Sequence, residues 1–336
     1  MSTRHQLKFF AIGLLVAISL SSFIIRSATA DKYDFVVAQD GSGDFKTIQA
    51  AIDASKAFPY QRIRILIKKG VYNEKVIVPS CNTRLSLIGE SADSTIITFG
   101  DHFKKIDRGR NSTFYTATLW IQANDFHAEN LTIENSAGPV GQALAVAVEA
   151  DRCSFRNCKL LGNQDTLYVA GENARQFFVN CYIEGTTDFI FGEATAFFQE
   201  CTIRIKTNSF ITAASTPEGV AYGFVLKRCN ILAAPGVDKA ILGRPWRKYA
   251  KTVYLNCTMG SFISPAGWEN WNDPANEKTA FYAEYKSTGE GAAPAKRVAW
   301  SKQLSDKEAK KYTVANVLGI KKATTEVERE WMERLK

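Results

Sequence analysis

The sequence predicts an all-β fold, a parallel β-helix in which each strand pairs with the equivalent strand one coil later. From Val36 onward, short runs rich in β-branched and aromatic residues alternate with turn residues, as strands and their connections do. A polar or charged residue followed by a cysteine and a short apolar segment also recurs, at intervals of 23, 20, 28 and 28 residues. Irregular periods of this length with β character are typical of solenoid coils. The repeated cysteines are Cys158, Cys181, Cys201, Cys229 and Cys257.

Clear helical periodicity is confined to the two ends of the repeat region. In residues 45–55, Ile48 and Ile52 share one helical face. We therefore expect a short N-terminal capping helix that covers the open end of the first coil, as the terminal caps of repeat proteins do. Near the C-terminus, Val327 and Trp331 are four residues apart, which predicts a helical tail.

Residues 1–30 carry the pattern of a secretory signal peptide. Basic residues precede an apolar run over residues 9–25, and the small residues at 28–30 offer a cleavage site. The alternative, an uncleaved membrane anchor, is disfavoured because the run is short and contains serines. We predict a secreted protein in which residues 31–336 form one domain, with no membrane attachment after cleavage.

Seven cysteines in a secreted chain usually suggest disulfides. Five of them, however, occupy one repeat position, and stacked positions on adjacent coils lie about 4.8 Å apart. This spacing favours a buried ladder of free thiols that pack as small hydrophobes. One or two disulfides remain open, with Cys81 or Cys153 as the candidates outside the ladder. No metal site is expected, because the chain has three histidines and no Cys-x-x-Cys pair.

The chain is basic, with a formal net charge of +8. A basic secreted protein suits a polyanionic partner. Simple solubility is the alternative, and net charge alone does not decide between the two.

Four polar residues recur at the coil spacing: Gln142, Gln164, Asp165 and Asp188 are separated by 22, 1 and 23 residues. On coils of this length they lie on three successive coils at similar positions, so two amides and two carboxylates share one patch. A polar ladder, like the asparagine stacks of solenoid turns, is the alternative. Two aspartates fit such a ladder poorly, because stacked like charges repel.

Two neighbouring carboxyls predict a dyad in which one stays ionised and the other holds a proton. The ionised aspartate can act as a nucleophile and its protonated partner as a general acid. The amides of Gln142 and Gln164 can donate to a developing oxyanion. A cation is needed to keep the nucleophile ionised, and Arg244 is the candidate, although it lies more than one coil past Asp188.

Several aromatic residues stand beside polar or glycine-rich segments. Exposed aromatic rings around a cleft are typical platforms for the apolar faces of sugars, although any one ring is more often part of a core. Trp246, next to Arg244 and Pro245, is the strongest candidate. The set is Phe114, Tyr168, Phe191, Trp246, Trp268 and Trp271.

These motifs together resemble those of the pectin methylesterases (pectinesterases, carbohydrate esterase family 8). Residues 244–250, with the later Asn-Trp-Asn-Asp-Pro, look more like bacterial members. The resemblance implies a right-handed parallel β-helix and hydrolysis of the C6 methyl ester of galacturonosyl residues in pectin, giving methanol and pectate. The matching segments span nearly the whole chain after the signal: Asp40–Phe45, Gly70–Glu74, Gly138–Ala143, Gly162–Tyr168, Asp188–Gly192, Leu242–Trp246 and Pro265–Trp268.

The resemblance also implies roles at individual positions. Asp188 looks like the nucleophile that attacks the ester carbonyl. Asp165 looks like the acid that protonates methanol and then the base that activates water. Gln142 and Gln164 look like the oxyanion hole, and Arg244 like the partner of Asp188. The implied substrate-binding positions are Gln142, Arg244, Trp246, Tyr168, Phe191, Trp268, Thr118 and Phe114.

We expect a monomer that binds pectin and no nucleic acid, without a cofactor or metal, and that is secreted to the cell exterior or, in a Gram-negative bacterium, to the periplasm. Two other functions fit the sequence less well. A non-catalytic pectin-binding β-helix would be expected to lack one of the two aspartates, a glutamine or the arginine, and all five are present. A polysaccharide lyase on the same fold would need acidic calcium sites and a basic residue to abstract a proton, whereas two carboxylates with amides suit acyl transfer better.

Overall fold

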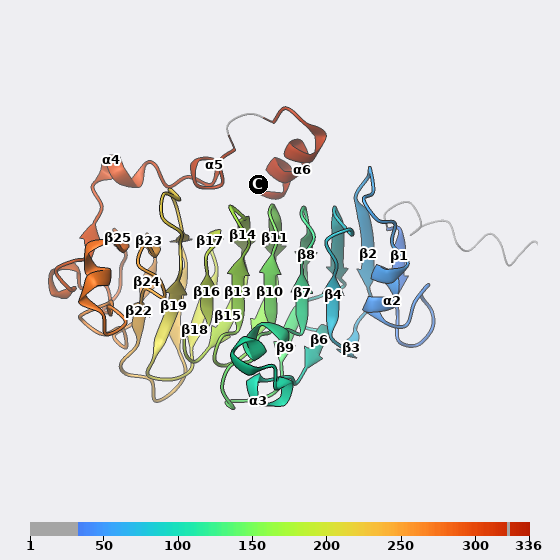
Figure 1. Cartoon of the computed structure of the whole chain (residues 1–336), viewed down its shortest axis with the longest axis horizontal. Helices are drawn as coiled ribbons and strands as arrows, with labels where there is room; N and C mark the ends of the chain where they lie inside the picture. The colour runs from blue at the N-terminus through green and yellow to red at the C-terminus, as the bar shows by residue number, and fades with distance from the viewer. Residues whose placement is uncertain (1–32, 321–322) are drawn as a thin grey trace, which may run out of the picture.

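Each short strand pairs in parallel with its equivalents one coil earlier and one coil later, because every coil returns the chain to the same place before the next begins. The computed structural model describes residues 33–320 and 323–336. In these residues the strands form three sheets wound into a right-handed parallel β-helix (Figure 1). The predicted fold class is confirmed.

Sheets A, B and C are named by their strands in the described residues. Sheet A contains β1 (Phe35–Val37), β2 (Ile63–Ile67), β5 (Leu85–Gly89), β8 (His127–Glu129), β11 (Cys153–Arg156), β14 (Arg175–Val179), β17 (Thr195–Gln199), β20 (Phe224–Lys227), β23 (Lys251–Leu255), β25 (Phe281–Tyr285) and β26 (Lys302–Gln303). Sheet B contains β3 (Gly70–Asn73), β6 (Thr95–Phe99), β9 (Thr132–Asn135), β12 (Lys159–Leu161), β15 (Tyr182–Gly185), β18 (Thr202–Ile205), β21 (Asn230–Ala233) and β24 (Thr258–Met259). Sheet C contains β4 (Val76–Val78), β7 (Leu119–Ile121), β10 (Val146–Glu149), β13 (Leu167–Ala170), β16 (Ile190–Gly192), β19 (Phe210–Ala214) and β22 (Ile241–Gly243).

The cysteine repeat marks the corner between sheets A and B. The residue before each ladder cysteine is left-handed, with φ of 52° at Asn157 and 53° at Asn180. Asparagine tolerates this conformation better than most residues, and it turns the chain sharply into the next strand. The five ladder thiols are buried in the solenoid interior, and all seven cysteines are free. The ladder prediction is confirmed, and neither Cys81 nor Cys153 forms a disulfide.

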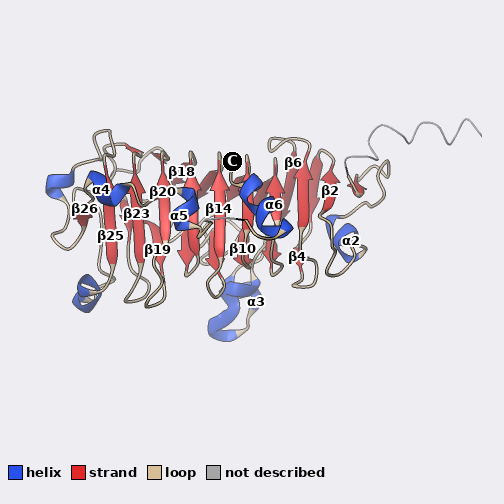
Figure 2. Ribbon diagram, turned by 90° about the horizontal axis from the view of Figure 1, so that it is seen from above, coloured by secondary structure: helices blue, strands red, loops and turns tan. Residues whose placement is uncertain are grey.

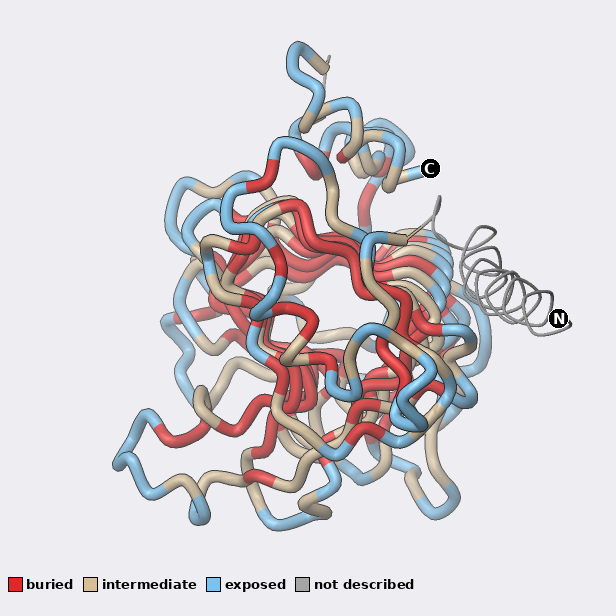
Figure 3. Tube along the Cα trace, turned by 90° about the vertical axis from the view of Figure 1, so that its right-hand side faces the viewer, coloured by how far each residue is buried: buried red, intermediate tan, exposed pale blue. Residues whose placement is uncertain are grey.

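The interior is built from stacked equivalents. The rings of Phe155, Phe178 and Phe198, on three successive coils, stack with centroids 4.8 Å apart at each step. Seen along the solenoid axis, buried residues gather in the coil walls and exposed ones in the loops that project from them (Figure 3). Side chains from distant parts of the sequence are therefore aligned because equivalent positions on successive coils stack one interstrand spacing apart, even though the coils differ in length.

The N-terminal end is covered as predicted. Helix α2 (Ile48–Asp53) begins at the N-cap Thr47 and packs Ile48 and Ile52 into the core. The carboxylate of Glu74 accepts hydrogen bonds from the first helical amides, which fixes the helix against the second coil. After β26, helices α4 (Asp306–Ala309), α5 (Val314–Val317) and α6 (Glu326–Arg334) run back along the outer face of sheet A (Figure 1).

The tail buries an apolar outer face of sheet A. Phe177, Phe197 and Val253 on the sheet contact Leu318 and Trp331 from the tail in one buried cluster. Two short 3-10 helices, η2 (Pro274–Lys278) and η3 (Pro294–Lys296), flank β25. The helical tail expected from the sequence is confirmed.

An insertion after β6 interrupts the coils. Between β6 and β7, α3 (Phe103–Ile106) and the 3-10 helix η1 (Gly109–Tyr115) form a flap, residues 100–118, that projects beyond the coils (Figure 2). The predicted signal peptide, residues 1–30, lies outside the described residues. No helix in the described part of the chain is long and apolar enough to cross a membrane.

Candidate active site

The four polar residues predicted to converge do so at the start of three neighbouring strands of sheet C. Gln142 comes before β10, Gln164 and Asp165 before β13, and Asp188 before β16. Leu167 pairs with Ile190, so Asp165 and Asp188, each two residues earlier, hold equivalent places on adjacent coils. Together with Arg244 they line one cavity of about 310 Å³.

The backbone at both aspartates is left-handed, with φ of 65° at Asp165 and 49° at Asp188. A bulge accompanies the first, because the amides of Ala145 and Val146 both donate to the carbonyl of Thr166. Bulges re-aim side chains, and left-handed non-glycine residues cluster at functional sites. The local geometry thus turns these carboxylates out of the regular inside–outside alternation of the strands and into the cavity.

Arg244 follows β22 directly, and its backbone amide donates to the carbonyl of Thr212 at 2.9 Å. Its guanidinium donates to both carboxylate oxygens of Asp188, at 3.0 Å from Nε and 2.7 Å from Nη2. The same guanidinium lies 3.8 Å from the ring centres of Phe210 and Trp271. The two rings hold the guanidinium between them, so the geometry of its two hydrogen bonds with Asp188 is fixed.

The two carboxyls have different surroundings. Asp165 is only 9% exposed, and its carboxylate has no hydrogen-bond or ion-pair partner among residues 33–320 and 323–336. Burial, with the charge of Asp188 adding to it, raises the pKa of Asp165 well above its usual value, against a smaller opposing effect of Arg244. Burial also raises the pKa of Asp188, but hydrogen bonds and charge from Arg244 oppose that rise. Asp165 therefore holds a proton more tightly than Asp188 does.

The two glutamine amides are free to act in the cavity. No side-chain hydrogen bond within the described chain occupies Gln142 or Gln164, while a backbone bridge joins the two residues. The carbonyl of Gln142 accepts from the amide of Phe103 at 2.9 Å, which ties it to the flap. Buried Asn135 braces the same region by donating to the carbonyls of Asp101, Thr116 and Leu144.

An apolar floor continues from the polar groups along the outer face of sheet C. Ala147, Tyr168, Phe191 and Ala213 are paired in register on four successive strands. Their rings meet those of the cavity walls: Tyr168 lies 5.0 Å from Phe114 and 4.9 Å from Phe191, and Phe191 lies 5.8 Å from Trp246. The cavity thus pairs a polar centre with a long aromatic surface.

Two predicted substrate-binding residues lie elsewhere. Trp268 is 2% exposed and packs inside the solenoid against Tyr254 and Tyr282, because its backbone extends sheet C beside Gly243 and the strand alternation turns it inward. Thr118 is fully buried and donates to the carbonyl of Glu134. Neither lines the cavity, so both predictions are corrected.

Sequence reasoning also missed parts of the wall. Trp271, three residues after Trp268, lines the cavity and was recognised only as one aromatic among several. Arg110 and Thr113 line it from the flap, which the coil repeat does not include, so no spacing pointed to them. Among the described residues, no group of three or more histidines, cysteines, aspartates or glutamates comes together as potential metal ligands.

The fold is a parallel β-helix, and its cavity holds two neighbouring aspartates, an arginine bound to one of them, and aromatic walls. Comparison with known proteins identifies the family. The family model described as Pectinesterase matches residues 34–321. The chain belongs to the pectinesterase family.

Individual relatives agree with this. The chain is 39% identical over 281 residues to Pectinesterase 31 of Arabidopsis thaliana. The aligned region covers 81% of this chain and 88% of the relative. It spans about half the length of other Arabidopsis relatives, which are named as pectinesterase/pectinesterase inhibitor proteins. Pectin methylesterase from carrot is 36% identical with a TM-score of 0.81, over 85% of this chain and 93% of that one. A pectin methylesterase solved in complex with a hexasaccharide is 32% identical with a TM-score of 0.77, over 87% and 99%.

Proposed function

We propose that this protein hydrolyses the C6 methyl esters of galacturonosyl residues in pectin, releasing methanol and leaving pectate. The observation that carries the proposal is the pair of buried aspartates in one cavity, one clamped by Arg244 and the other unpaired. Membership of the pectinesterase family supports the reaction, and the hexasaccharide complex of a similar enzyme supports an oligosaccharide occupant.

In the first half of the reaction, ionised Asp188 attacks the ester carbonyl carbon. The carbonyl oxygen becomes an oxyanion, to which the free amides of Gln142 and Gln164 donate. Asp165, which holds its proton tightly, gives that proton to the departing methoxide as the C–O bond breaks. Methanol leaves, and the galacturonosyl carbonyl is joined to Asp188 as an anhydride.

In the second half, Asp165 is a carboxylate and takes a proton from water. The resulting hydroxide attacks the anhydride carbonyl, and the same amides stabilise the second oxyanion. Cleavage of the anhydride restores ionised Asp188 and protonated Asp165 and gives a galacturonic acid, which releases its proton to the solvent and leaves as galacturonate. Arg244 acts throughout by orienting Asp188 and stabilising its ionised form through two charged hydrogen bonds.

The aromatic surface provides the sugar sites. Trp246, Trp271, Phe191 and Phe114 line the cavity, and Tyr168 continues the floor beneath Phe114. Flat rings suit the apolar faces of galacturonosyl residues, while the polar centre receives the ester group. We further propose that the protein acts as a secreted monomer once residues 1–30 are removed.

The test uses residues 31–336 purified without the signal and incubated with highly methylated pectin. We expect methanol to appear in step with acidification of the medium, at the same rate with and without EDTA. Loss of activity in EDTA would contradict the metal-free mechanism. Chain cleavage with an unsaturated uronate product, in place of methanol, would instead indicate a lyase.

A further inference from the structure

One carboxylate next to the cavity has no part in the proposed chemistry. Glu269 directly follows Trp268, whose backbone bridges to Gly243 at the edge of sheet C. The amide of Glu269 donates to the carbonyl of Gly243 at 3.3 Å. Arg244 and Glu269 therefore hold equivalent positions on neighbouring coils. Because Trp268 points into the solenoid, strand alternation places Glu269 on the outer face together with Arg244.

The two oxygens of this carboxylate have different surroundings. Oε1 of Glu269 accepts a hydrogen bond from the backbone amide of Asn272 at 2.9 Å. Oε2 is closed off from solvent and has no hydrogen-bond partner within residues 33–320 and 323–336. The carboxylate of Asp165 is also unpartnered, but it lines the cavity, whereas Glu269 does not. A buried oxygen without a partner is costly, so the contacts around Glu269 hold it there.

The bonded oxygen closes a strained turn. Trp271 and Asn272 are both left-handed, with φ of 62° and 54°. Asparagine tolerates this conformation, but a bulky tryptophan adopts it only where the surrounding structure imposes it. The hydrogen bond from the amide of Asn272 to Glu269 spans Trp271. The position of the indole therefore depends on the carboxylate of Glu269.

This indole contacts the catalytic pair. The ring centre of Trp271 lies 3.8 Å from the guanidinium of Arg244, and that of Phe210 lies at the same distance. Arg244 in turn donates to both carboxylate oxygens of Asp188. A continuous chain of contacts therefore runs from Glu269 to the nucleophile.

The charge of Glu269 acts on the same pair. Burial is the main cause that raises the pKa of Asp188, and the hydrogen bonds and charge of Arg244 oppose that rise. The charge of Glu269 adds to the rise and so acts against Arg244. The other groups around Asp188 that carry or can carry a charge are Asp165 and Arg110 on the cavity wall and buried Tyr282 on β25.

Building on the proposed function, we infer that Glu269 is a positioning residue for the nucleophile and acts in two ways. Its bonded oxygen holds Trp271 against Arg244, and its charge limits how strongly Arg244 stabilises ionised Asp188. A carboxylate that its arginine stabilises too strongly is a weaker nucleophile, because attack on the ester requires it to give up that charge. The unpaired oxygen of Glu269 places the opposing charge one coil away, outside the cavity.

Glu269→Gln tests the effect of the charge, because glutamine keeps an acceptor for the amide of Asn272 but is neutral. We expect the acidic limb of the pH profile of kcat/KM to move to lower pH, since the charge that helps to raise the pKa of Asp188 is removed. Glu277→Gln is the matched control: Glu277 accepts from the side chain of Asn270 at 2.7 Å and does not line the cavity. This control should leave the limb in place.

Glu269→Ala tests the effect of the acceptor. We expect kcat to fall by about 10–100-fold, a common cost of losing a group that orients a catalytic residue, and to fall far less in Glu269→Gln. A purely structural role would lower the activity of Glu269→Ala but leave the pH profile of Glu269→Gln unchanged. Wild-type kcat in Glu269→Ala, or an unmoved acidic limb in Glu269→Gln, would overturn the inference.

A measurement without turnover separates this inference from the proposed reaction. Urea unfolding of the wild type, Asp188→Asn, Glu269→Gln and the double variant at neutral pH forms a thermodynamic cycle. We expect Glu269→Gln to shift the unfolding midpoint more favourably in the wild type than in Asp188→Asn, because only an aspartate at position 188 repels Glu269. Additive shifts would contradict the inference. Non-additive shifts in a protein that releases no methanol would retain the charge coupling and refute the proposed reaction.

Discussion

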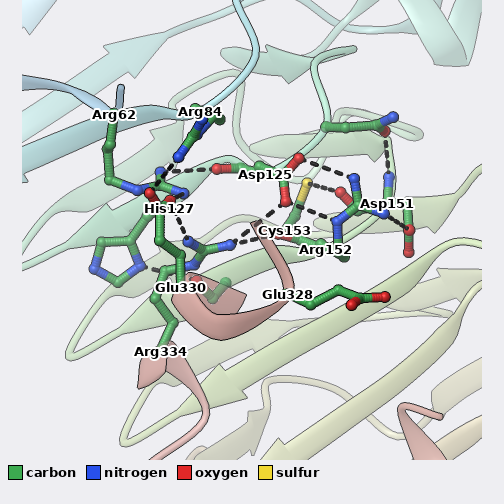
Figure 4. A network of polar contacts seen from close by, with 12 residues as sticks. Arg62, Arg84, Asp125, His127, Asp151, Arg152, Cys153, Glu328, Glu330 and Arg334 are labelled. Carbon is green, nitrogen blue, oxygen red and sulfur yellow. Dashed lines mark hydrogen bonds and ion pairs between the residues drawn. The ribbon is translucent and has the colours of Figure 1, made fainter. Parts of the chain in front are cut away.

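Two regions of this protein bury acidic and basic side chains, and they use them in opposite ways. The first is the cavity of Asp165, Asp188 and Arg244. The second joins α6 to the outer face of sheet A and is called here the α6 cluster: Arg62, Arg84, Asp125, Arg152, Glu330 and Arg334 (Figure 4).

In the α6 cluster every carboxylate has arginine partners. Glu330 accepts from Arg62 at 3.2 Å and also pairs with Arg84, and Asp125 accepts from Arg152 at 2.7 Å. Burial favours the neutral form of Glu330, but the ion pairs with Arg84 and Arg62 outweigh it and lower its pKa. In the cavity, Asp165 has no such partner and its pKa moves the other way.

The two regions therefore serve different purposes, one structural and one chemical. A buried carboxylate that is paired with arginines holds one element against another and has no role in a reaction. An unpaired one is destabilising in the folded state and persists because the surrounding coils hold it in place. Substitutions in both regions test this contrast.

Asp188→Asn should lower methanol release by more than about 10⁴-fold, because removal of a nucleophile typically costs that much or more. Asparagine tolerates the left-handed backbone at this position, so the fold should remain intact. Methanol release and circular dichroism measure the two effects. A folded variant with near-full turnover would remove Asp188 from the reaction.

Gln142→Ala should reduce kcat on the order of 10²–10³-fold, the usual cost of losing one oxyanion donor. KM should change little, since the amide is needed chiefly when the oxyanion forms. Steady-state kinetics on methylated oligogalacturonides separate the two constants. An increase in KM alone would mean that Gln142 binds the ground state instead.

Glu330→Gln should destabilise the protein by about 2 kcal/mol, because Arg62 and Arg84 are left partly buried without their carboxylate. Activity per folded molecule should be unchanged, since the α6 cluster lies on sheet A and the cavity on sheet C. Urea unfolding followed by fluorescence measures the loss. Glu326→Gln is the matched control: its side chain is 66% exposed, and its removal should cost under about 0.5 kcal/mol.

Asp165→Asn should abolish turnover yet stabilise the protein at neutral pH by about 1 kcal/mol, a size common for substitutions that relieve a functional site. The folded-state pKa of Asp165 is raised, so its contribution is favourable below the pKa of the unfolded chain and is lost as pH rises through the folded value. The gain from Asp165→Asn should therefore grow from acidic to neutral pH.

Glu330 should show the reverse dependence. Its folded-state pKa is lowered, so its stabilising effect is present above the unfolded value and disappears as pH falls through the folded value. Thermal melts of Asp165→Asn and Glu330→Gln, each compared with the wild type from acidic to neutral pH, should give stability differences that change with pH in opposite directions. Parallel curves would mean that the two regions do not differ as described.

The sequence predicted those features whose positions follow from the coil repeat. The cysteine spacing predicted the solenoid, and the 23-residue interval from Asp165 to Asp188 predicted adjacent carboxylates, because stacking converts a sequence period into a distance. Arg244 was harder, because it lies more than one coil beyond Asp188. Only its long side chain, held between Phe210 and Trp271, brings the charge back to the aspartate.

The coil repeat could not predict the direction of side chains at strand ends or the position of residues in the flap. Trp268 and Trp271 are three residues apart in the sequence, and only Trp271 faces the cavity. The backbone bridge between Gly243 and Trp268 makes Trp268 part of sheet C and points its side chain into the solenoid. Thr118 was misplaced for the same reason, since the strand entry at β7 turns it inward. Arg110 and Thr113 reach the cavity through the fold of an insertion, and this follows from tertiary packing rather than from any local pattern.

The long reach of the α6 cluster has a consequence for how the protein is made. Arg62 and Glu330 are 268 residues apart, so this contact joins an early coil to a segment synthesised after every coil is complete. Parallel coils can form in order as the chain leaves the ribosome, since each one needs only its predecessor. We therefore expect the docking of α6 to be the last step of folding, and we expect a nascent chain that lacks α6 to expose Arg62, Arg84 and the apolar face of sheet A to chaperones and proteases.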